Sequence, residues 1–426
     1  MILIKDISVL TMEGESSFLD RANILIDGEK IVKISGDPID LEGKEVKAIN
    51  GEGKVAMPGL INTHTHMGMC LFRNYGNDLA LTDWLERAIY PLEAKLEAED
   101  IYYGAMLNMA EMMRFGATRF VDMYMFEDEI ARACEDIGMG GVLANGFVDF
   151  DDVEKKIEKI KENVSKYKGS SLIDFAIAPH AIYTVCGDNY ERLATLSEDL
   201  DTLMHTHLSE TREEVETAFD KYGKSPVAYM RDLGVFNRPT IAAHCVHVSD
   251  EDIEILAEEG VFVSHNPSSN LKLASGFAPI KKMMDRKVVV SLGTDGSASN
   301  NSLNMVEEMH LASLLAKGVS GDPKALDAYE SLKMATVNGA KAIRREDLGM
   351  VKEGMTADIA IFDLDGVHMT PMNDPEASLV YSLQGSDCND LIINGDLVME
   401  DKKIISIDVD ALKEEVRARS KRLING

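Results

Sequence analysis

Residues 58–68 read PGLINTHTHMG, and this stretch decides the expected fold. An apolar run leads into two imidazoles, His64 and His66, which stand two positions apart. Side chains of a β-strand alternate between its two faces, so residues two apart share a face. Both rings can therefore point to one spot at the end of the strand, where two nitrogens can bind one ion.

The middle of the chain repeats this pattern, because short apolar runs with polar ends alternate with amphipathic helical stretches such as 99–116 and 249–260. The candidate strands are 55–66, 117–124, 141–146, 172–180, 201–207, 239–245, 260–267 and 287–295. Eight strand–helix units predict an α/β fold, a (β/α)8 TIM barrel over residues 56–350, with its site at the C-terminal strand ends. A doubly wound sheet is the alternative, but it needs a glycine-rich phosphate loop after the first strand, and HTHMGM is not one.

Both ends of the chain differ from this middle. Residues 1–10 and 22–34 are typical of short strands with a turn, and the same texture returns in 357–366 and 390–401. We expect residues 1–55 and 351–426 to form one smaller β-sandwich domain. Residues 409–424 have helical periodicity and are expected to close the chain as a helix.

The composition is that of a globular protein, with 45% hydrophobic and 27% charged residues. A net charge of −29 repels phosphate backbones, so nucleic acid is not an expected partner. No apolar run approaches the roughly 20 residues of a membrane span, and the N-terminus lacks the basic segment of a signal peptide. The five cysteines are widely spaced, which predicts reduced thiols and a cytoplasmic protein without membrane contact.

Donor side chains gather at the predicted strand ends. His207 and Asp295 end the fifth and eighth strands and can join His64 and His66 in one cluster. Three imidazoles and one carboxylate, with a position left for water, suit one divalent metal ion; Zn²⁺ is expected, with Fe²⁺ or Mn²⁺ as alternatives. A single histidine at a strand end is usually a hydrogen-bonded structural residue, but four donors arriving together favour a metal site.

The remaining histidines are assigned more modest roles. His180, His244 and His265 also fall at or near strand ends. His205 is spaced from His207 as His64 is from His66, and we expect it to support the site. His247 and His310 are expected to be structural or to face solvent.

Four motifs in this order, PGLINTHTH, HTHLSET, AAHC and LGTDGSASNN, resemble the amidohydrolase superfamily, and within it the methylthioadenosine/S-adenosylhomocysteine deaminase group. The resemblance covers nearly the whole chain. It implies the metal ligands His64, His66, His207 and Asp295, and proton transfer by Glu210. It further implies a supporting role for His244, substrate contacts from Glu93 and His180, and a homo-oligomer, either a tetramer or a dimer.

The fourth predicted strand ends in IAPH, with no lysine there or at the end of the third. Members of the superfamily with two metals typically carry a carboxylated lysine at this place, so we expect one metal ion per chain. Two tightly bound ions needed for activity would contradict this expectation.

The expected reaction is hydrolytic deamination at C6 of an adenine-type ring. A divalent cation lowers the pKa of a water molecule. Asp295 would take the proton, His244 would orient the water, and Glu210 would donate to N1 before ammonia leaves. Glu210 also fits a plain helix N-terminal carboxylate, and Glu93 lies in an acidic stretch where most glutamates are only solvated.

The strand-end loops carry few basic residues, and Arg73 and Lys272 are the nearest candidates, so no cationic site for a phosphate group is evident. A neutral nucleoside is therefore favoured over a nucleotide. Trp84 either covers the apolar 5' end of the nucleoside or anchors packing. Asn145 stands where some relatives have arginine, so the preferred 5' group stays open among adenosine, 5'-deoxyadenosine, methylthioadenosine and S-adenosylhomocysteine. The alternatives are a deaminase or hydrolase of another heterocycle, such as guanine or a triazine, and a non-catalytic scaffold.

Overall fold

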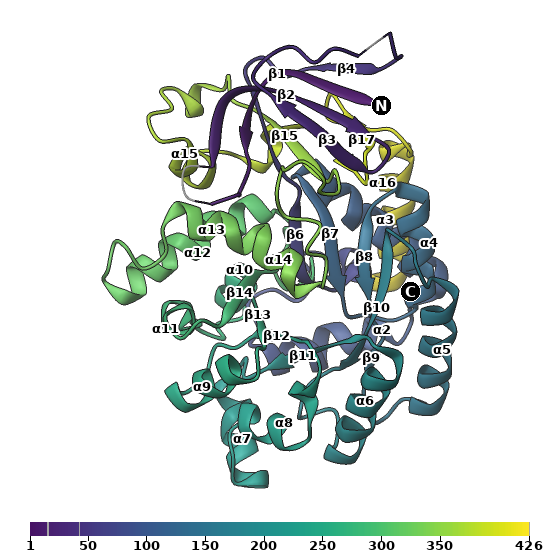
Figure 1. The fold of residues 1–426 in the computed structure, drawn as a ribbon. Helices are drawn as coiled ribbons and strands as arrows, with labels where there is room; N and C mark the ends of the chain where they lie inside the picture. The colour runs from purple at the N-terminus through teal and green to yellow at the C-terminus, as the bar shows by residue number, and fades with distance from the viewer. Residues whose placement is uncertain (15–16, 42, 426) are drawn as a thin grey trace.

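The computed structural model describes residues 1–14, 17–41 and 43–425, and its centre is a parallel barrel (Figure 1). The strands run in the order β14-β13-β12-β11-β10-β8-β7-β6, with the short β9 beside β10. Their bounds are β6 (Leu60–Thr65), β7 (Ala117–Asp122), β8 (Gly140–Leu143), β9 (Gly146–Phe147), β10 (Ile173–Pro179), β11 (Leu203–Leu208), β12 (Thr240–His244), β13 (Phe262–His265) and β14 (Val289–Leu292). The predicted eight-stranded α/β barrel is confirmed.

The first and last barrel strands meet at a polar seam. Among the described residues, no backbone ladder pairs β6 with β14. One backbone hydrogen bond crosses the seam, from Asp295 N–H to the His64 carbonyl at 3.0 Å. Side chains add further contacts: the hydroxyl of Thr63 lies 2.8 Å from that of Ser291. Asn62 Nδ2 donates to Thr294 Oγ1 at 2.7 Å, and Thr294 N–H donates back to Asn62 Oδ1 at 3.0 Å.

The two chain ends form a second sheet at one end of the barrel (Figure 1). Its strands are β1 (Ile2–Leu10), β2 (Phe18–Asp27), β3 (Lys30–Ser35), β4 (Lys47–Asn50), β5 (Lys54–Pro58), β15 (Ile359–Asp363), β16 (Cys388–Ile393), β17 (Asp396–Glu400) and β18 (Lys403–Ile404). The β3 end of this sheet returns to residues 354–357, where Ile31 N–H donates to the Met355 carbonyl at 3.0 Å. The sheet thereby curls around its own core, and the β-rich module expected from both ends is confirmed.

The side chains of β5 and β15 alternate between two hydrophobic cores, one inside the curled sheet and one on the side of the barrel. Ala56 and Ile361 pack inside the curled sheet, whereas Met57 and Phe362 pack on the barrel side. Because successive side chains of a strand point to opposite faces, one short strand serves both cores.

The chain changes sheets at Gly59, between β5 and β6. A Cβ built on Gly59 would lie 2.3 Å from the side chain of Thr118, so only glycine fits at this crossing. The predicted single strand 55–66 is therefore wrong, because residues 54–58 belong to the sheet of the chain ends. The predicted division of the chain into 1–55, 56–350 and 351–426 stays a prediction.

Helices surround the barrel (Figure 1). Their bounds are α1 (Leu81–Trp84), α2 (Tyr90–Glu93), α3 (Ala98–Arg114), α4 (Glu127–Ile137), α5 (Val153–Lys166), α6 (Gly187–Leu200), α7 (Arg212–Tyr222), α8 (Pro226–Asp232), α9 (Asp250–Glu258), α10 (Pro267–Lys272), α11 (Ile280–Asp285), α12 (Met305–Ser320), α13 (Ala328–Ala335), α14 (Val337–Ala342), α15 (Pro375–Tyr381) and α16 (Val409–Asn425). The predicted closing helix is α16, and its Arg419 and Arg422 pair with the buried Asp100 of α3. Within the described ranges, no helix is both long and apolar enough to cross a membrane.

A buried ion pair joins the barrel to the second sheet. Arg119 of β7 donates to both carboxylate oxygens of Asp358, at 2.7 and 3.1 Å, and both side chains are only 3% exposed. Arg119 also donates to the Ser171 carbonyl at 2.9 Å. The pair therefore fixes the barrel against the sheet of the chain ends.

Replacing Arg119 by methionine is expected to lower the free energy of unfolding by about 3–5 kcal/mol, because Asp358 would stay buried without its cation. Denaturant unfolding, followed by circular dichroism, measures this loss. Arg21→Met is the matched control: Arg21 pairs with Asp6 at the surface, so its loss is expected to cost about 0–1 kcal/mol. Equal effects of the two changes would contradict this account.

Candidate functional site

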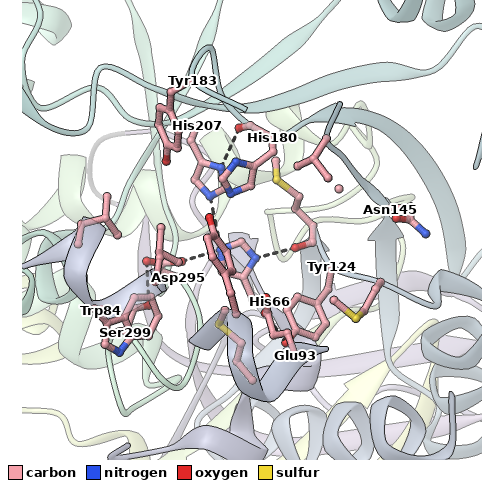
Figure 2. Close-up of a pocket in the computed structure, with 18 of the residues that line it drawn as sticks. His66, Trp84, Glu93, Tyr124, Asn145, His180, Tyr183, His207, Asp295 and Ser299 are labelled. Atoms are coloured by element: carbon pink, nitrogen blue, oxygen red, sulfur yellow. Dashed lines mark hydrogen bonds and ion pairs between the residues drawn. The ribbon is translucent and has the colours of Figure 1, made fainter. Parts of the chain in front are cut away.

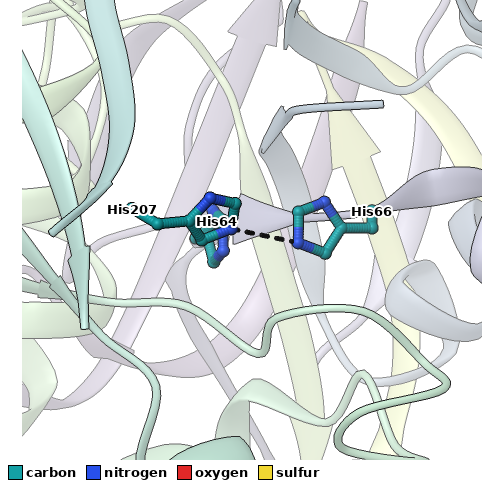
Figure 3. Close-up of side chains that lie close together, drawn as sticks. All are labelled: His64, His66 and His207. Carbon is teal, nitrogen blue, oxygen red and sulfur yellow. Dashed lines mark hydrogen bonds between the residues drawn. The ribbon is translucent and has the colours of Figure 1, made fainter. Parts of the chain in front are cut away.

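Three histidines meet at the C-terminal mouth of the barrel (Figure 3). His64 lies at the end of β6, His66 directly follows that strand, and His207 lies near the end of β11. Their candidate ligand atoms all lie within 4.8 Å of one another, and the Nε2 atoms of His66 and His207 are 3.4 Å apart. The three rings that were predicted to converge do so, and all three are buried.

Asp295 follows β14 and completes the cluster. Its Oδ1 lies 3.0 Å from His66 Nε2 and 3.4 Å from His64 Nε2. Its Oδ2 accepts from the hydroxyls of Ser269 and Ser299, at 2.6 and 2.8 Å. These hydrogen bonds hold the carboxylate while it faces the histidines, and Asp295 keeps a left-handed backbone conformation, with φ of +63°, to do so.

In His66 and His207, the ring nitrogen that faces away from the cluster is Nδ1, and it is hydrogen-bonded to a backbone carbonyl. His66 Nδ1 donates to the Met123 carbonyl at 2.6 Å, and His207 Nδ1 donates to the His180 carbonyl at 2.9 Å. This arrangement leaves both Nε2 atoms facing the cluster. Metal-binding histidines are oriented in this way, by a hydrogen bond from the nitrogen that does not bind the ion.

The Nδ1 atom of His64 is also held by a hydrogen bond, but its partner is a second histidine, His205. His205 Nδ1 lies 3.1 Å from the Ile241 carbonyl and donates to it. Burial lowers the pKa of His205 to about 3, so the ring is neutral and its Nε2 must accept from His64 Nδ1, 2.8 Å away. His64 Nε2 is then a buried lone pair without a hydrogen-bond partner, aimed at the cluster. A divalent cation fits such a donor set.

His244 and Glu210 lie beside these donors. His244 ends β12 with φ of +75°, and its Nδ1 lies 2.8 Å from Asn270 Oδ1. Its Nε2 lies 3.7 Å from Glu210 Oε2, and Glu210 Oε1 accepts from the Ser275 hydroxyl at 3.0 Å. Candidate ligand atoms of His244, His64 and Asp295 also lie within 4.8 Å of one another. Burial raises the pKa of Glu210, which favours a protonated carboxyl.

Three members of the cluster, His66, His207 and Asp295, line a cavity of about 480 Å³ (Figure 2). This volume is in the range of small-molecule sites. The cavity brings together the predicted substrate-contact residues Trp84, Glu93, His180 and Glu210. It is otherwise lined mainly by apolar and aromatic side chains, including Met69, Leu85, Tyr90, Met123, Met125, Phe150, Tyr183 and Leu273.

Glu93 reaches this cavity from α2. Its Oε1 accepts from the hydroxyl of Tyr124 at 2.7 Å, and burial raises its pKa. Glu93 is therefore a held carboxyl at the cavity wall and not one of the solvated glutamates of its acidic stretch. His180 Nδ1 lies 2.9 Å from the hydroxyl of Thr184, and burial lowers the pKa of its ring to about 3. A neutral imidazole thus faces the cavity.

The lysine at the cavity wall is Lys156, whereas Arg73 and Lys272, the basic residues expected nearest to the site, lie elsewhere. Arg73 pairs with Glu111, and Lys272 donates to the Ala298 carbonyl at 2.9 Å, so neither lines the cavity. Lys156 of α5 does line it, but its ammonium group pairs with Asp151. No strand-end pattern marks Lys156, because it lies in helix α5, away from the strand ends.

Asn145, at the predicted end of the third strand, is also at the cavity wall. Its Nδ2 donates to Glu127 at 2.7 Å, and its buried Oδ1 has no hydrogen-bond partner. Four histidines have no expected role at the site and lie apart from the cavity lining: His247 is 2.6 Å from the Ser275 carbonyl, His310 is 3.2 Å from the Val380 carbonyl, His368 is 2.8 Å from the Asp387 carboxylate, and His265 is buried.

Comparison with known proteins agrees with this geometry. Residues 55–398 match the amidohydrolase family. The chain is 46% identical to the 5-methylthioadenosine/S-adenosylhomocysteine deaminase of Caldanaerobacter subterraneus subsp. tengcongensis, over 100% of this chain and 99% of that protein. It is 42% identical to the 5'-deoxyadenosine deaminase of Methanosarcina mazei, over 99% and 98% of the two chains.

A solved structure extends this likeness to the fold. The adenosine deaminase of Xanthomonas campestris, determined with bound zinc, superposes with a TM-score of 0.96 at 32% identity. The superposition covers 100% of this chain and 99% of that chain, the sheet of the chain ends included. The chain therefore belongs to the amidohydrolase family, and the resemblance that its motifs predicted is confirmed.

Proposed function

We propose that this amidohydrolase catalyses the metal-dependent hydrolytic deamination of adenosine-type nucleosides, giving inosine-type products and ammonia. The substrates are 5'-deoxyadenosine, methylthioadenosine, S-adenosylhomocysteine and adenosine, in keeping with the names of its relatives. The observation that carries the proposal is the buried carboxyl of Glu210 beside a four-donor cluster, on the floor of a cavity of about 480 Å³.

The proposed metal ligands are His64, His66, His207 and Asp295, and the proposed ion is a single Zn²⁺, with Fe²⁺ or Mn²⁺ as alternatives. Three committed Nδ1 atoms, the unpartnered His64 Nε2 and the zinc of the similar structure support this assignment. When bound, such a cation lowers the pKa of a water molecule and so supplies a nucleophile near neutral pH. Metal analysis of the purified protein tests both the identity and the number of the ions.

The protein's own groups carry the protons. Asp295 accepts the proton that the water loses, and His244, held by Asn270, orients the water toward C6 of the ring. Glu210 enters protonated and donates to N1, which offsets the charge that develops as water adds to C6. The proton held by Asp295 passes to the amino group, which leaves as ammonia, and Glu210 regains a proton from the C6 hydroxyl as the carbonyl forms.

Glu93, His180 and Trp84 are the proposed substrate-binding residues. Glu93 can accept hydrogen bonds from ribose hydroxyls, because Tyr124 occupies one of its oxygens and the other stays available. His180 adds a neutral imidazole at the cavity wall. Trp84 is almost fully buried and contributes an apolar surface. The pairing of Lys156 with Asp151 leaves little positive charge for a phosphate, which favours nucleosides over nucleotides.

The test is ammonia release from the four nucleosides, with AMP, guanine and a triazine measured in parallel. Deamination of the nucleosides, with little or none of the other compounds, supports the proposal. Faster reaction with guanine or a triazine would favour the alternative, an enzyme for another heterocycle on the same site. Faster reaction with AMP would contradict the preference for an uncharged 5' group.

The pH dependence of kcat is expected to respond to Ser275. Its hydroxyl donates to Glu210, which favours the charged carboxylate and lowers its pKa against the effect of burial. Since Glu210 acts as an acid, kcat falls as the pH rises through the pKa of Glu210. Ser275→Ala removes the hydrogen bond and raises that pKa, so the alkaline limb of the kcat profile is expected to move to higher pH. A limb that stays in place, or moves to lower pH, would contradict the acid role.

We further propose that the protein is a homo-oligomer, a tetramer or a dimer, in the cytoplasm. The first part rests on family likeness alone, and light scattering of the purified protein tests it. The second is supported by the cysteines, all five of which are free: Cys70, Cys134, Cys186, Cys245 and Cys388. Cell fractionation tests the location.

A further inference from the structure

A sharp turn after β11 places Glu210 at the site. Ser209 has φ of +50°, a left-handed conformation that is strained for any residue other than glycine. Ser209 and Glu210 are both buried, so their backbone N–H groups need partners within the protein. The turn therefore needs hydrogen-bond acceptors for the backbone N–H groups of both Ser209 and Glu210.

Glu214 of α7 holds them. Its Oε1 accepts from the Ser209 N–H at 2.9 Å, and its Oε2 accepts from the Glu210 N–H at 2.8 Å. Glu214 is itself buried, and its own N–H donates to Thr211 Oγ1 at 3.1 Å. One carboxylate thus accepts hydrogen bonds from two successive backbone N–H groups, and one of these belongs to Glu210, the proposed acid.

This contact differs from ordinary capping of a helix. Thr211 is the N-cap of α7, and in a capping box the glutamate three residues later bonds to the N–H of the cap residue itself. Here the glutamate reaches past the cap to the two preceding residues. It therefore holds the turn in front of the helix, in addition to anything it contributes to the helix end.

We propose that Glu214 is a positioning residue for the deamination: it fixes the Ser209–Glu210 turn, and through it sets the distance from the Glu210 carboxyl to its neighbours at the site. This inference rests on the proposed function, because it needs Glu210 to be the acid. The Glu210 carboxyl lies 3.0 Å from the Ser275 hydroxyl and 3.7 Å from His244 Nε2. A shift of the turn by about 1 Å would disturb both contacts and can lower the rate by roughly 100-fold.

Glu214→Gln tests the proposal. The amide keeps the size of the side chain, but its NH₂ group meets one of the two N–H donors, so the turn must move. We expect kcat per bound metal ion to fall about 10–100-fold, with KM and metal content close to those of the unchanged enzyme. Glu216→Gln is the matched control, because Glu216 is an exposed glutamate in the same helix, and it should leave kcat unchanged.

A double-mutant cycle with Glu210→Gln separates positioning from a merely structural role. If Glu214 acts through Glu210, adding Glu214→Gln to Glu210→Gln should lower the residual rate by no more than about 2-fold. Additive losses, or an unchanged kcat per metal ion in Glu214→Gln, would overturn the inference and leave the proposed function intact. Full activity of Glu210→Gln alone would instead overturn the proposed function, and the inference with it.

Glu214→Asp is measured in the same cycle, so that the result does not depend on one variant folding. It keeps the charge but shortens the side chain by one methylene group, and it should lower kcat in the same way. Thermal unfolding of each variant shows whether a loss of rate follows a loss of folded protein, which would also overturn the inference.

Discussion

Glu210→Gln is expected to lower kcat by about 10²–10⁴-fold, the usual contribution of a general acid. The amide is nearly the same size as the carboxyl but cannot give up a proton to N1. Because Glu210 is not one of the four proposed metal ligands, the bound metal should be unaffected. Steady-state kinetics on 5'-deoxyadenosine or adenosine, together with metal analysis, measures both quantities.

The control for this change is Glu213→Gln, three residues further along the chain. Glu213 is exposed, so the same chemical change there should leave kcat almost unaltered. An equal loss of kcat in both variants, or a loss of metal from Glu210→Gln, would mean that Glu210 supports the structure of the site and does not act as the acid.

His66→Ala is expected to remove the metal ion and with it the activity. Loss of a residue that merely orients a ligand typically costs about 10–100-fold in metal affinity, so loss of a ligand should cost more than about 100-fold. The alanine would also leave Asp295 without the nearest of its imidazole neighbours, 3.0 Å away. Metal content after dialysis, and kcat before and after adding Zn²⁺, measure the effect.

His310→Ala is the control for the loss of an imidazole. His310 lies in α12 and approaches the Val380 carbonyl, outside the lining of the cavity. It should keep its metal and its kcat. Retention of a full metal ion by His66→Ala would show that the ion is held by other residues, such as the neighbouring group formed by His64, His244 and Asp295.

The barrel and the convergence of the candidate metal ligands could be predicted because both depend on strand periodicity. Strand ends in a closed parallel barrel meet at one face, so polar residues at those ends are brought together whatever their separation in sequence. His66 and Asp295 are more than two hundred residues apart in the chain and 3.0 Å apart in space. The strand pattern alone makes such a pairing foreseeable.

The residues that hold these groups could not be found in the same way. Ser269 lies in the short helix α10, and Ser275 and Ser299 lie outside the helices and strands. Hydroxyl groups are common in such segments, and no periodicity marks the few that face inward. Lys156 lines the cavity from α5, away from the strand ends. The change of sheets at Gly59 was missed because two short apolar strands in sequence read as one longer strand.

The polar seam between β6 and β14 has a consequence for the whole barrel. Most neighbouring barrel strands are joined by ladders of peptide hydrogen bonds, but at this join, in the described part of the chain, a single peptide hydrogen bond and a few hydroxyl and amide side chains connect the strands. His64 and His66 lie on one side of the join and Asp295 on the other, so the proposed ion, bound by all three, would link the two sides of the join. Metal binding should therefore stabilise the closed barrel, and the ion should contribute to fold stability as well as to chemistry.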